Sequence, residues 1–257
     1  RDVMSAVAMR ADPEPLGGEC AGRVTAVGAG VTEFAIGDAV VAVAEGCFAT
    51  HAVCDARLAT ALPATMSHAE AVTLPFAAMT ALHALVDLGG LAPQHTVLVH
   101  AAAGGVGSAA VQIAQRAGAT VIATAGSERK RAHLRALGVQ HVLDSRSTSF
   151  AGEVQALTGG RGVDLLLNSL AGDFIAAGAR CLAAGGVFLE IGKRDIWDAE
   201  RFARERAAVS DPGRFHAIDL NAMRIADPAA FLALYRRAMH SGSAEALRPL
   251  PLRAFAM

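Results

Sequence analysis

The sequence predicts an α/β protein in which a doubly wound parallel sheet is inserted into a smaller β-rich domain. Three observations lead to this fold class. Over residues 96–191, short apolar strands alternate with amphipathic helical segments, which is the pattern of βαβ units in a parallel sheet. A glycine-rich turn follows the first of these strands. Before them, over residues 17–61, short Val/Ala runs are separated by Gly-containing turns, as in a β-rich unit.

The individual elements are placed by hydrophobic periodicity and by Gly, Pro and Ser punctuation. Early in the chain, residues 23–27 and 39–43 are expected strands, Ser67 is the expected N-cap of a helix at 68–71, and a second helix is expected over 78–88. The expected strands of the parallel sheet are 96–100, 120–124, 141–143, 163–167 and 187–191, and the expected helices between them are 106–116, 128–137, 150–157 and 175–182.

This order of elements predicts three segments. Residues 1–75 form the N-terminal part of the β-rich domain, residues 76–222 form the domain with the parallel sheet, and residues 223–257 return to the β-rich domain. The last segment carries an expected helix at 228–240 and an extended tail at 247–255. Neither end of the chain shows a completed element, so the chain is expected to be a fragment with both parts of the β-rich domain truncated.

Composition and charge exclude several classes of protein. With 53% hydrophobic and 18% charged residues, the 257-residue chain has enough apolar material for a buried core. The formal net charge of −1 gives no overall basic field for nucleic acid or for an anionic membrane surface. The sequence shows neither an evident membrane span nor the layout of a signal peptide, so we expect a cytoplasmic protein. The four scattered cysteines lack the paired spacing of a structural zinc site.

The glycine-rich turn has the sequence AAAGGVGS at 101–108 and lies between a strand and a helix. Missing side chains let the backbone approach a pyrophosphate, and the helix N-terminus offers N–H groups and a partial positive charge. The candidate contacts to a dinucleotide in a Rossmann-type fold are Ala103, Gly104, Gly105, Val106 and Gly107. The pattern is AxxGxxG rather than GxGxxG, and the alternative is a tight turn without a ligand.

The end of the second strand favours NADPH over NADH. An NAD site typically has an acidic residue there for the ribose hydroxyls, whereas this chain continues Thr-Ala-Gly-Ser-Glu-Arg-Lys-Arg at 124–131. Hydroxyl and basic groups suit a ribose 2′-phosphate. The candidate ligands are Ser127, Lys130, Arg131 and, from the following loop, Arg146. In the alternative interpretation, Ser127 only caps the helix and the basic side chains point into water.

Four motifs in order carry a resemblance to a known family: LGGECAG at 16–22, HAAAGGVG at 100–107, LNSLA at 167–171 and FLEIGK at 188–193. Together they resemble the enoyl reductase domains of modular polyketide synthases, which are zinc-free members of the medium-chain dehydrogenase/reductase superfamily. The resemblance covers essentially the whole chain. It implies a Rossmann-type domain inserted in a GroES-like substrate domain, with acyl carrier protein and neighbouring synthase domains as partners.

The resemblance also implies a reaction: NADPH-dependent reduction of the α,β-double bond of an enoyl thioester, with hydride to the β-carbon and a proton to the α-carbon. Lys193 and Asp219 are the implied catalytic residues, while Asn168, Ser169 and Gly192 are implied cofactor contacts. A lysine at the carboxyl end of a sheet strand opens into the ligand crevice. Gly18 stands where zinc alcohol dehydrogenases carry a histidine ligand, so no metal is expected.

Several alternatives stay open at this level. They are a zinc-free NADPH quinone oxidoreductase, a variant that forms a cyclopropane, and a non-catalytic relic of the fold. Many relatives place a tyrosine in the segment that corresponds to residues 9–12, whereas the one tyrosine here is Tyr235, so the stereochemistry of α-protonation is open. His83 and His100 are interpreted as packed structural residues.

Overall fold

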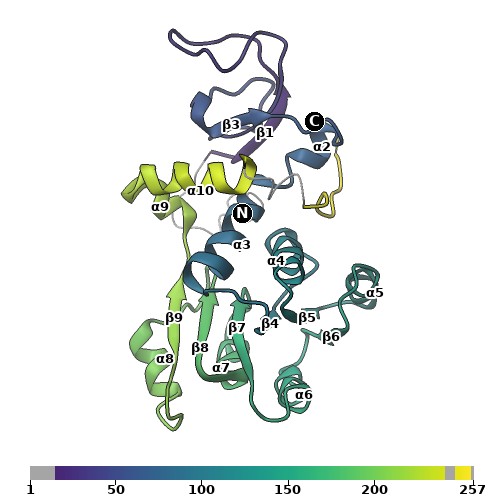
Figure 1. Ribbon diagram of the computed structural model, residues 1–257, viewed down its shortest axis with the longest axis vertical. Helices are drawn as coiled ribbons and strands as arrows, with labels where there is room; N and C mark the ends of the chain where they lie inside the picture. The colour runs from purple at the N-terminus through teal and green to yellow at the C-terminus, as the bar shows by residue number, and fades with distance from the viewer. Residues whose placement is uncertain (1–14, 241–246, 256–257) are drawn as a thin grey trace. The chain divides into compact units, whose positions relative to one another are not determined.

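The computed structural model describes residues 15–240 and 247–255. The chain divides into two compact units, one made of residues up to Met79 together with residues from Asp227 onwards, and the other of Thr80–Ala226 (Figure 1). The described residues before Thr80 and after Ala226 therefore belong to one unit, and the parallel-sheet unit is inserted between them in the chain.

The first unit contains a three-stranded antiparallel sheet in the order β1-β2-β3. Its elements are β1 (Glu19–Arg23), β2 (Ala39–Val43), the 3₁₀ turn η1 (Ala56–Leu58), β3 (Ala59–Ala61), α2 (His68–Ala71) and α10 (Pro228–His240), and α3 (Pro75–Leu82) crosses into the second unit. The carboxylate of Glu19 accepts a hydrogen bond from the backbone N–H of Phe76 at 2.9 Å. This contact gives the glutamate of the LGGECAG motif a structural role, because it joins β1 to the first turn of α3.

The sequence prediction of a strand at 23–27 was wrong, since β1 is Glu19–Arg23. The last pair of the β1–β2 register is Arg23 with Ala39, the first residue of β2. Beyond this pair the partner strand has not begun, so residues after Arg23 have no strand to extend along. The predicted strand at 39–43 is confirmed.

One other prediction for this unit is confirmed. Ser67 is the N-cap of α2, and it forms a capping box with Glu70 in which each side chain bonds the other residue's backbone N–H. The chain after α10 returns to the first unit, where the N–H of Leu250 donates to the hydroxyl of Thr73 at 3.2 Å. The tail at 247–255 contains no strand within the described residues, so its expected extended element is not part of the sheet.

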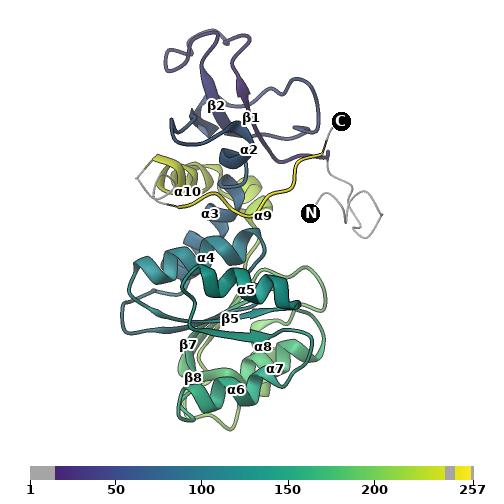
Figure 2. The same ribbon diagram turned by 90° about the vertical axis from the view of Figure 1, so that its right-hand side faces the viewer.

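The second unit is a six-stranded parallel sheet in the order β6-β5-β4-β7-β8-β9. Its elements are η2 (His83–Leu88), β4 (Thr96–Val99), α4 (Gly105–Arg116), β5 (Thr120–Ala125), α5 (Glu128–Ala136), β6 (His141–Asp144), α6 (Phe150–Leu157), β7 (Val163–Asn168), α7 (Asp173–Cys181), β8 (Leu182–Glu190), α8 (Ala199–Glu205), β9 (Arg214–Ala217) and α9 (Leu220–Ala226). In this unit α4 and α5 lie on one face of the sheet, whereas α6, α7 and α8 lie on the other (Figure 2). The predicted doubly wound Rossmann-type sheet is confirmed.

The chain order reverses between β4 and β7, which are neighbours in the sheet. From β4 the strands run outward to β5 and β6 on one side, and from β7 they run to β8 and β9 on the other. Ligands of such sheets bind beyond the carboxyl ends of the strands at this reversal point. Three elements here were not predicted: the helices α8 and α9, and the edge strand β9, a short segment with a mixed polar and apolar sequence.

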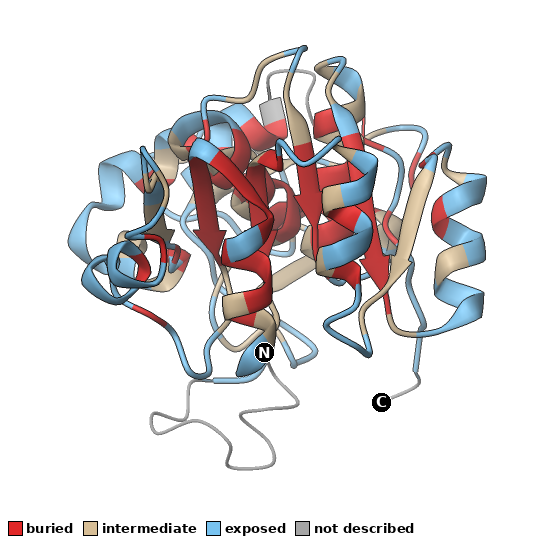
Figure 3. Cartoon of the chain, turned by 90° about the horizontal axis from the view of Figure 1, so that it is seen from below, coloured by how far each residue is buried: buried red, intermediate tan, exposed pale blue. Residues whose placement is uncertain are grey.

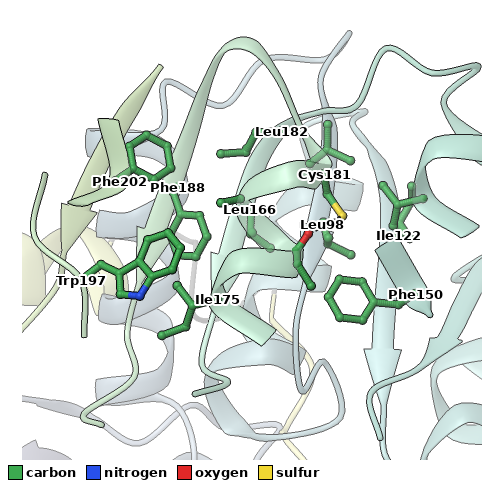
Figure 4. Close-up of a cluster of buried hydrophobic side chains, with 14 residues drawn as sticks. Leu98, Ile122, Phe150, Leu166, Ile175, Cys181, Leu182, Phe188, Trp197 and Phe202 are labelled. Atoms are coloured by element: carbon green, nitrogen blue, oxygen red, sulfur yellow. Dashed lines mark hydrogen bonds between the residues drawn. The ribbon is translucent and has the colours of Figure 1, made fainter. Parts of the chain in front are cut away.

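Buried residues concentrate in the central strands and on the inner faces of the helices (Figure 3). A large cluster fills the face of the sheet under α6, α7 and α8 and includes Leu98, Phe150, Leu166, Phe188 and Phe202 (Figure 4). Its aromatic rings contact one another, as in the edge-on pair of Phe188 and Phe202 at 5.8 Å between centroids. This packing holds β7 and β8 in place and therefore fixes the strand ends where the candidate site lies.

Within the described residues, one helical stretch, His68–Leu88, has the length (21 residues) and apolar composition that a membrane crossing requires, and 50% of its most apolar window is buried inside the protein. Core helices often satisfy the same two criteria, so this is weak evidence for a span.

The buried Arg206, which follows α8, is only 3% exposed. Its guanidinium donates to the carbonyls of Pro212 at 2.7 Å and Ala183 at 2.8 Å, and to those of Leu182 and Ala179. One side chain thus bonds four carbonyl groups, which belong to α7, β8 and the loop before β9. Burial lowers the pKa of Arg206, because removing a cation from water is unfavourable.

We predict that Arg206→Met lowers the free energy of unfolding by about 2–4 kcal/mol, because buried carbonyls lose their charged donor. The measurement is the midpoint of chemical and thermal unfolding. Arg204→Met is the matched control, since that side chain pairs with Glu200 at 3.3 Å and is 67% exposed. Equal losses of stability in the two variants would contradict the assigned role.

Candidate functional site

The glycine-rich turn connects β4 to α4 at the reversal point of the sheet. The backbone N–H of Ala102 donates to the carbonyl of Thr124 at 2.9 Å, which ties the turn to β5. Gly104 is the N-cap of α4 and offers no side-chain bond to the first helical turn. The backbone N–H groups of that turn therefore suit an anionic group such as a pyrophosphate.

Gly107 explains why the turn requires glycine inside the helix. A Cβ atom at Gly107 would lie 2.6 Å from both the carbonyl oxygen of Ala101 and the Cα of Ala102. The first turn of α4 thus packs against the glycine-rich turn at a distance that admits only a hydrogen. Ala101 itself has a positive φ of 47°, a strained conformation for a residue with a side chain.

The end of β5 carries no acidic residue, as the sequence indicates, and the next carboxylate is already engaged. Glu128 pairs with Arg131 at 3.0 Å and with Arg135 at 2.7 Å. Ser127 is the N-cap of α5, and its hydroxyl oxygen accepts from the N–H of Lys130 at 3.4 Å. The hydroxyl hydrogen of Ser127 stays available as a donor, so capping and ligand binding are compatible at this residue.

The loop from β5 to α5 carries or contacts three of the four residues predicted to bind a 2′-phosphate, namely Ser127, Lys130 and Arg146. Arg146, from the loop after β6, donates through Nε to the carbonyl of Gly126 at 3.2 Å, beside Ser127. Lys130 is exposed on the first turn of α5. Arg131 lies near them but is already engaged, because its guanidinium bonds Asp144 at 3.2 Å and the carbonyl of Ala125 at 3.1 Å. Arg131 therefore joins the ends of β5 and β6.

Lys193 and Asp219 are brought together at the carboxyl edge of the sheet, after β8 and β9. The ammonium of Lys193 lies 2.8 Å from the carboxylate of Asp219 and also donates to the carbonyl of Ile218 at 3.3 Å. Both side chains are partly open to solvent, at 42% and 46% exposure. The structure thus forms a cation–carboxylate pair that is open to solvent.

The charge state of Asp219 follows from its partners. Burial acts to raise its pKa, but the hydrogen bonds from Lys193 and from the N–H groups of Ala222 and Asn221 outweigh burial and lower the pKa. The carboxylate stays ionised until the pH falls through this lowered value. The pair with Lys193 therefore persists through the neutral and mildly acidic range.

Another acidic residue, Glu190 at the end of β8, was not predicted from the sequence as a site residue. It is 1% exposed, and its carboxylate accepts hydrogen bonds from the side-chain amide of Asn168 and from the backbone N–H of Gly192, both at 2.6 Å. The signal in the sequence was a carboxylate at the end of the apolar run Val-Phe-Leu at 187–189. Buried carboxylates of this kind are uncommon unless they are paired.

The remaining candidates from the sequence have packed positions. The side chain of Asn168 is fully buried, and its amide also bonds the backbone of Leu170. His100 is buried with Nδ1 2.9 Å from the hydroxyl of Thr124, and burial lowers its pKa to about 3. Tyr235 is fully buried in the first unit, where its hydroxyl donates to the carbonyl of Val41 at 3.3 Å. The segment at 9–12, where many relatives carry a tyrosine, lies outside the described residues.

Two family models match the chain. The model of the alcohol dehydrogenase GroES-like domain matches residues 1–84, and that of the zinc-binding dehydrogenases matches residues 105–210. Among the described residues, no three His, Cys, Asp or Glu side chains are grouped so that they could hold a metal ion. The residues that the structure describes therefore do not form a zinc site.

The chain is similar to large synthases and to solved enoyl reductases. It is 43% identical over 242 residues to the mycocerosic acid synthase-like polyketide synthase of Mycobacterium tuberculosis, and the match covers 92% of this chain and 11% of that protein. The crystal structure of CurK enoyl reductase superposes with a TM-score of 0.88 at 35% identity and covers 99% of this chain and 79% of that one. The CurF ER cyclopropanase from the curacin A biosynthetic pathway superposes with a TM-score of 0.85 at 36% identity, over 93% and 70% of the two chains.

We predict that Gly107→Ala destabilises the protein by about 1–3 kcal/mol, since the new methyl overlaps the turn, and weakens dinucleotide binding. The measurements are the thermal midpoint and the quenching of NADPH fluorescence. Gly152→Ala is the control, because a Cβ atom there meets nothing within 4 Å and alanine favours helix α6 by about 0.5–1 kcal/mol. Unchanged NADPH affinity in Gly107→Ala would contradict the assignment of the turn.

Proposed function

We propose, since this chain belongs to the enoyl reductase domains of modular polyketide synthases, that it reduces the α,β-double bond of an enoyl thioester with NADPH. The observation that carries this proposal is the pair of Lys193 and Asp219 at 2.8 Å. It stands at the carboxyl edge of the sheet, where ligands of such folds bind. A proton source at this position suits a reaction that leaves a carbanion to be protonated.

The residues of the chain take separate parts in this proposal. A bound nicotinamide supplies the hydride that bonds to the β-carbon. Lys193 presents an ammonium N–H towards the enolate, and the proton that it releases bonds to the α-carbon. Asp219 holds that ammonium in place through the 2.8 Å hydrogen bond and keeps a negative charge beside it. A proton taken from water then restores Lys193.

NADPH is the proposed cofactor, and the glycine-rich turn and the loop after β5 support it. The proposed pyrophosphate contacts are Ala103, Gly104, Gly105, Val106 and Gly107, and the proposed 2′-phosphate ligands are Ser127, Lys130, Arg131 and Arg146. Arg131 contributes its charge while it holds Asp144. At the nicotinamide end of the cofactor we propose contacts from Ser169 and Gly192. Asn168 supports this region indirectly in the proposal, because its side-chain amide is hydrogen-bonded to Glu190 and to the backbone of Leu170.

A second candidate is cyclopropane formation, which the similarity to the CurF ER cyclopropanase favours. In that reaction the carbanion left by hydride addition displaces a leaving group on the substrate and forms a carbon–carbon bond in place of the C–H bond. The candidates differ in the fate of the α-carbon, since only reduction takes up a proton there.

The partners also belong to this proposal. The chain spans about a tenth of the length of the curated relative that it matches, 11% of the mycobacterial synthase. We therefore propose neighbouring synthase domains and an acyl carrier protein that delivers the thioester. The cytoplasmic location expected from the sequence is part of the same proposal.

We predict that NADPH oxidation with crotonyl-pantetheine falls by about a hundredfold or more in Lys193→Ala and Asp219→Ala, the range that general acids supply. The assay follows NADPH absorbance, and deuterium from D₂O incorporated at the α-carbon reports the proton step. Glu200→Ala, an exposed carboxylate in α8, is the control. Turnover of quinones but of no thioester by the parent protein would sink the proposal in favour of a quinone oxidoreductase.

We predict that Arg146→Ala weakens NADPH binding about tenfold, because one charge-assisted bond to a phosphate contributes about 1.5–3 kcal/mol, and leaves NADH binding unchanged. Fluorescence titrations of both dinucleotides provide the measurement. Arg135→Ala in α5 is the control, since its guanidinium pairs with Glu128. A parallel loss for NADPH and NADH would remove Arg146 from the 2′-phosphate site.

A further inference from the structure

We propose that Glu190 is a positioning residue that fixes the two chain segments leaving β7 and β8, and with them the nicotinamide end of the cofactor site. This inference rests on the proposed use of NADPH. It assigns a role to a buried carboxylate that does not itself reach the reacting atoms.

The contacts of Glu190 join three strand ends. Its carboxylate accepts from Asn168 at the end of β7 and from the N–H of Gly192 after β8, each at 2.6 Å. Its backbone carbonyl accepts from the N–H of Ile218 after β9 at 2.8 Å. The segments that carry Ser169, Lys193 and Asp219 therefore all begin within one or two residues of a bond to Glu190 or to its partner Asn168.

A carboxylate is the group that this arrangement requires. Both neighbours, the amide N–H of Asn168 and the backbone N–H of Gly192, are donors, and an ionised carboxylate offers two acceptor oxygens. Glutamine has one oxygen and would turn its own NH₂ group towards one of the two donors. An isosteric change at Glu190 thus releases either the β7 segment or the β8 segment.

Gly192 fits the same role. A Cβ atom there would lie 2.6 Å from Oε1 of Glu190 and 3.8 Å from the carbonyl carbon of Ser169. Glycine therefore lets the chain after β8 turn directly over the carboxylate and beside the segment after β7. A side chain at this position would displace the carboxylate of Glu190.

The energetic cost of Glu190 argues for a role beyond holding the sheet together. Burial raises the pKa of this carboxyl, and the bonds from Asn168 and Gly192 and the charge of Lys193 offset burial in part. Replacing a whole buried polar set by apolar residues is often neutral for stability, whereas removing the carboxylate alone would leave the buried amide of Asn168 without this acceptor. A group with this cost is better explained by the geometry that it imposes on Ser169 and Lys193.

The same sheet offers a matched control at its opposite edge. Asp164, near the start of β7, accepts from the backbone N–H of Thr96 at 2.7 Å and pairs with Arg161. It is also a carboxylate that joins two strand segments, but it lies at the amino end of β7, away from the candidate site. Asp164→Asn therefore tests the loss of a structural carboxylate alone.

The experiment compares the parent chain, Glu190→Gln and Asp164→Asn in three measurements. These are the thermal midpoint, the dissociation constants of NADPH and of adenosine 2′,5′-bisphosphate, which lacks the nicotinamide, and kcat and KM with crotonyl-pantetheine. In Glu190→Gln we expect NADPH to bind several-fold more weakly, with the bisphosphate unchanged and kcat reduced by on the order of tenfold to a hundredfold. Asp164→Asn is expected to lower the midpoint and leave the ratio of the two dissociation constants unchanged.

Gly192→Ala provides a second variant that keeps Glu190 and displaces its carboxylate, and it is expected to show the same selective loss. If either variant binds both ligands as the parent does, or loses both equally along with the thermal midpoint, the positioning role is overturned. If the parent itself reduces no thioester, the proposed reaction fails while the ratio of the two dissociation constants still decides the role of Glu190.

Discussion

The hydrogen-bond register between β7 and β8 determines which side chains reach the candidate site. Asn168 stands opposite Glu190, and Glu190 stands opposite Ala217 on β9. Because side chains alternate between the faces of a strand, a shift by one residue would turn Asn168 and Glu190 to opposite sides and separate them. The core beneath the strands, built from residues such as Leu166 and Phe188, prevents this shift, since a slip would carry these side chains out of their packed positions. Packing on one face of the sheet thus fixes the positions of Asn168 and Glu190 at its carboxyl edge.

The same register explains how much of the fold the sequence predicted. The strands on either side of the glycine-rich turn in the sheet, β4 and β5, are buried except at their first residues, so their positions followed from short apolar runs bounded by turn residues. The strand at 187–191 was predicted too short, because β8 begins at Leu182 and its pairing with β7 shifts between Val163 and Leu165. Gly185 and Gly186 suggested a loop at that point, whereas they accommodate the irregularity within the strand. The edge strand β9 has one neighbour, and its four residues carry no periodic signal strong enough to predict it.

The sequence likewise predicted only part of the candidate site. Lys193 and Asp219 were named because a family resemblance pointed to them, and their 2.8 Å contact depends on β8 and β9 being parallel neighbours, which spacing along the chain does not reveal. Glu190 was part of a quoted motif but received no role, because its partners Asn168 and Gly192 become informative only once their donors are seen to converge. The double engagement of Arg131 was also invisible in the sequence, since its partner Asp144 belongs to the next strand. The sequence indicated which residue types lie at the strand ends, but it did not reveal the contacts between residues on different strands.

Two carboxylates with opposite environments interact electrostatically with Lys193. Asp219 is half-exposed and its hydrogen bonds lower its pKa, while Glu190 is buried and its pKa is raised. An exposed carboxylate can exchange its bonds with water as a substrate arrives, so it suits the residue that orients a proton donor through a catalytic cycle. A buried carboxylate held by two donors keeps one geometry, because releasing either donor would leave a buried polar group unsatisfied. The carboxyl edge of the sheet therefore combines a buried carboxylate that holds the segments after β7 and β8 with a more exposed carboxylate that pairs with Lys193.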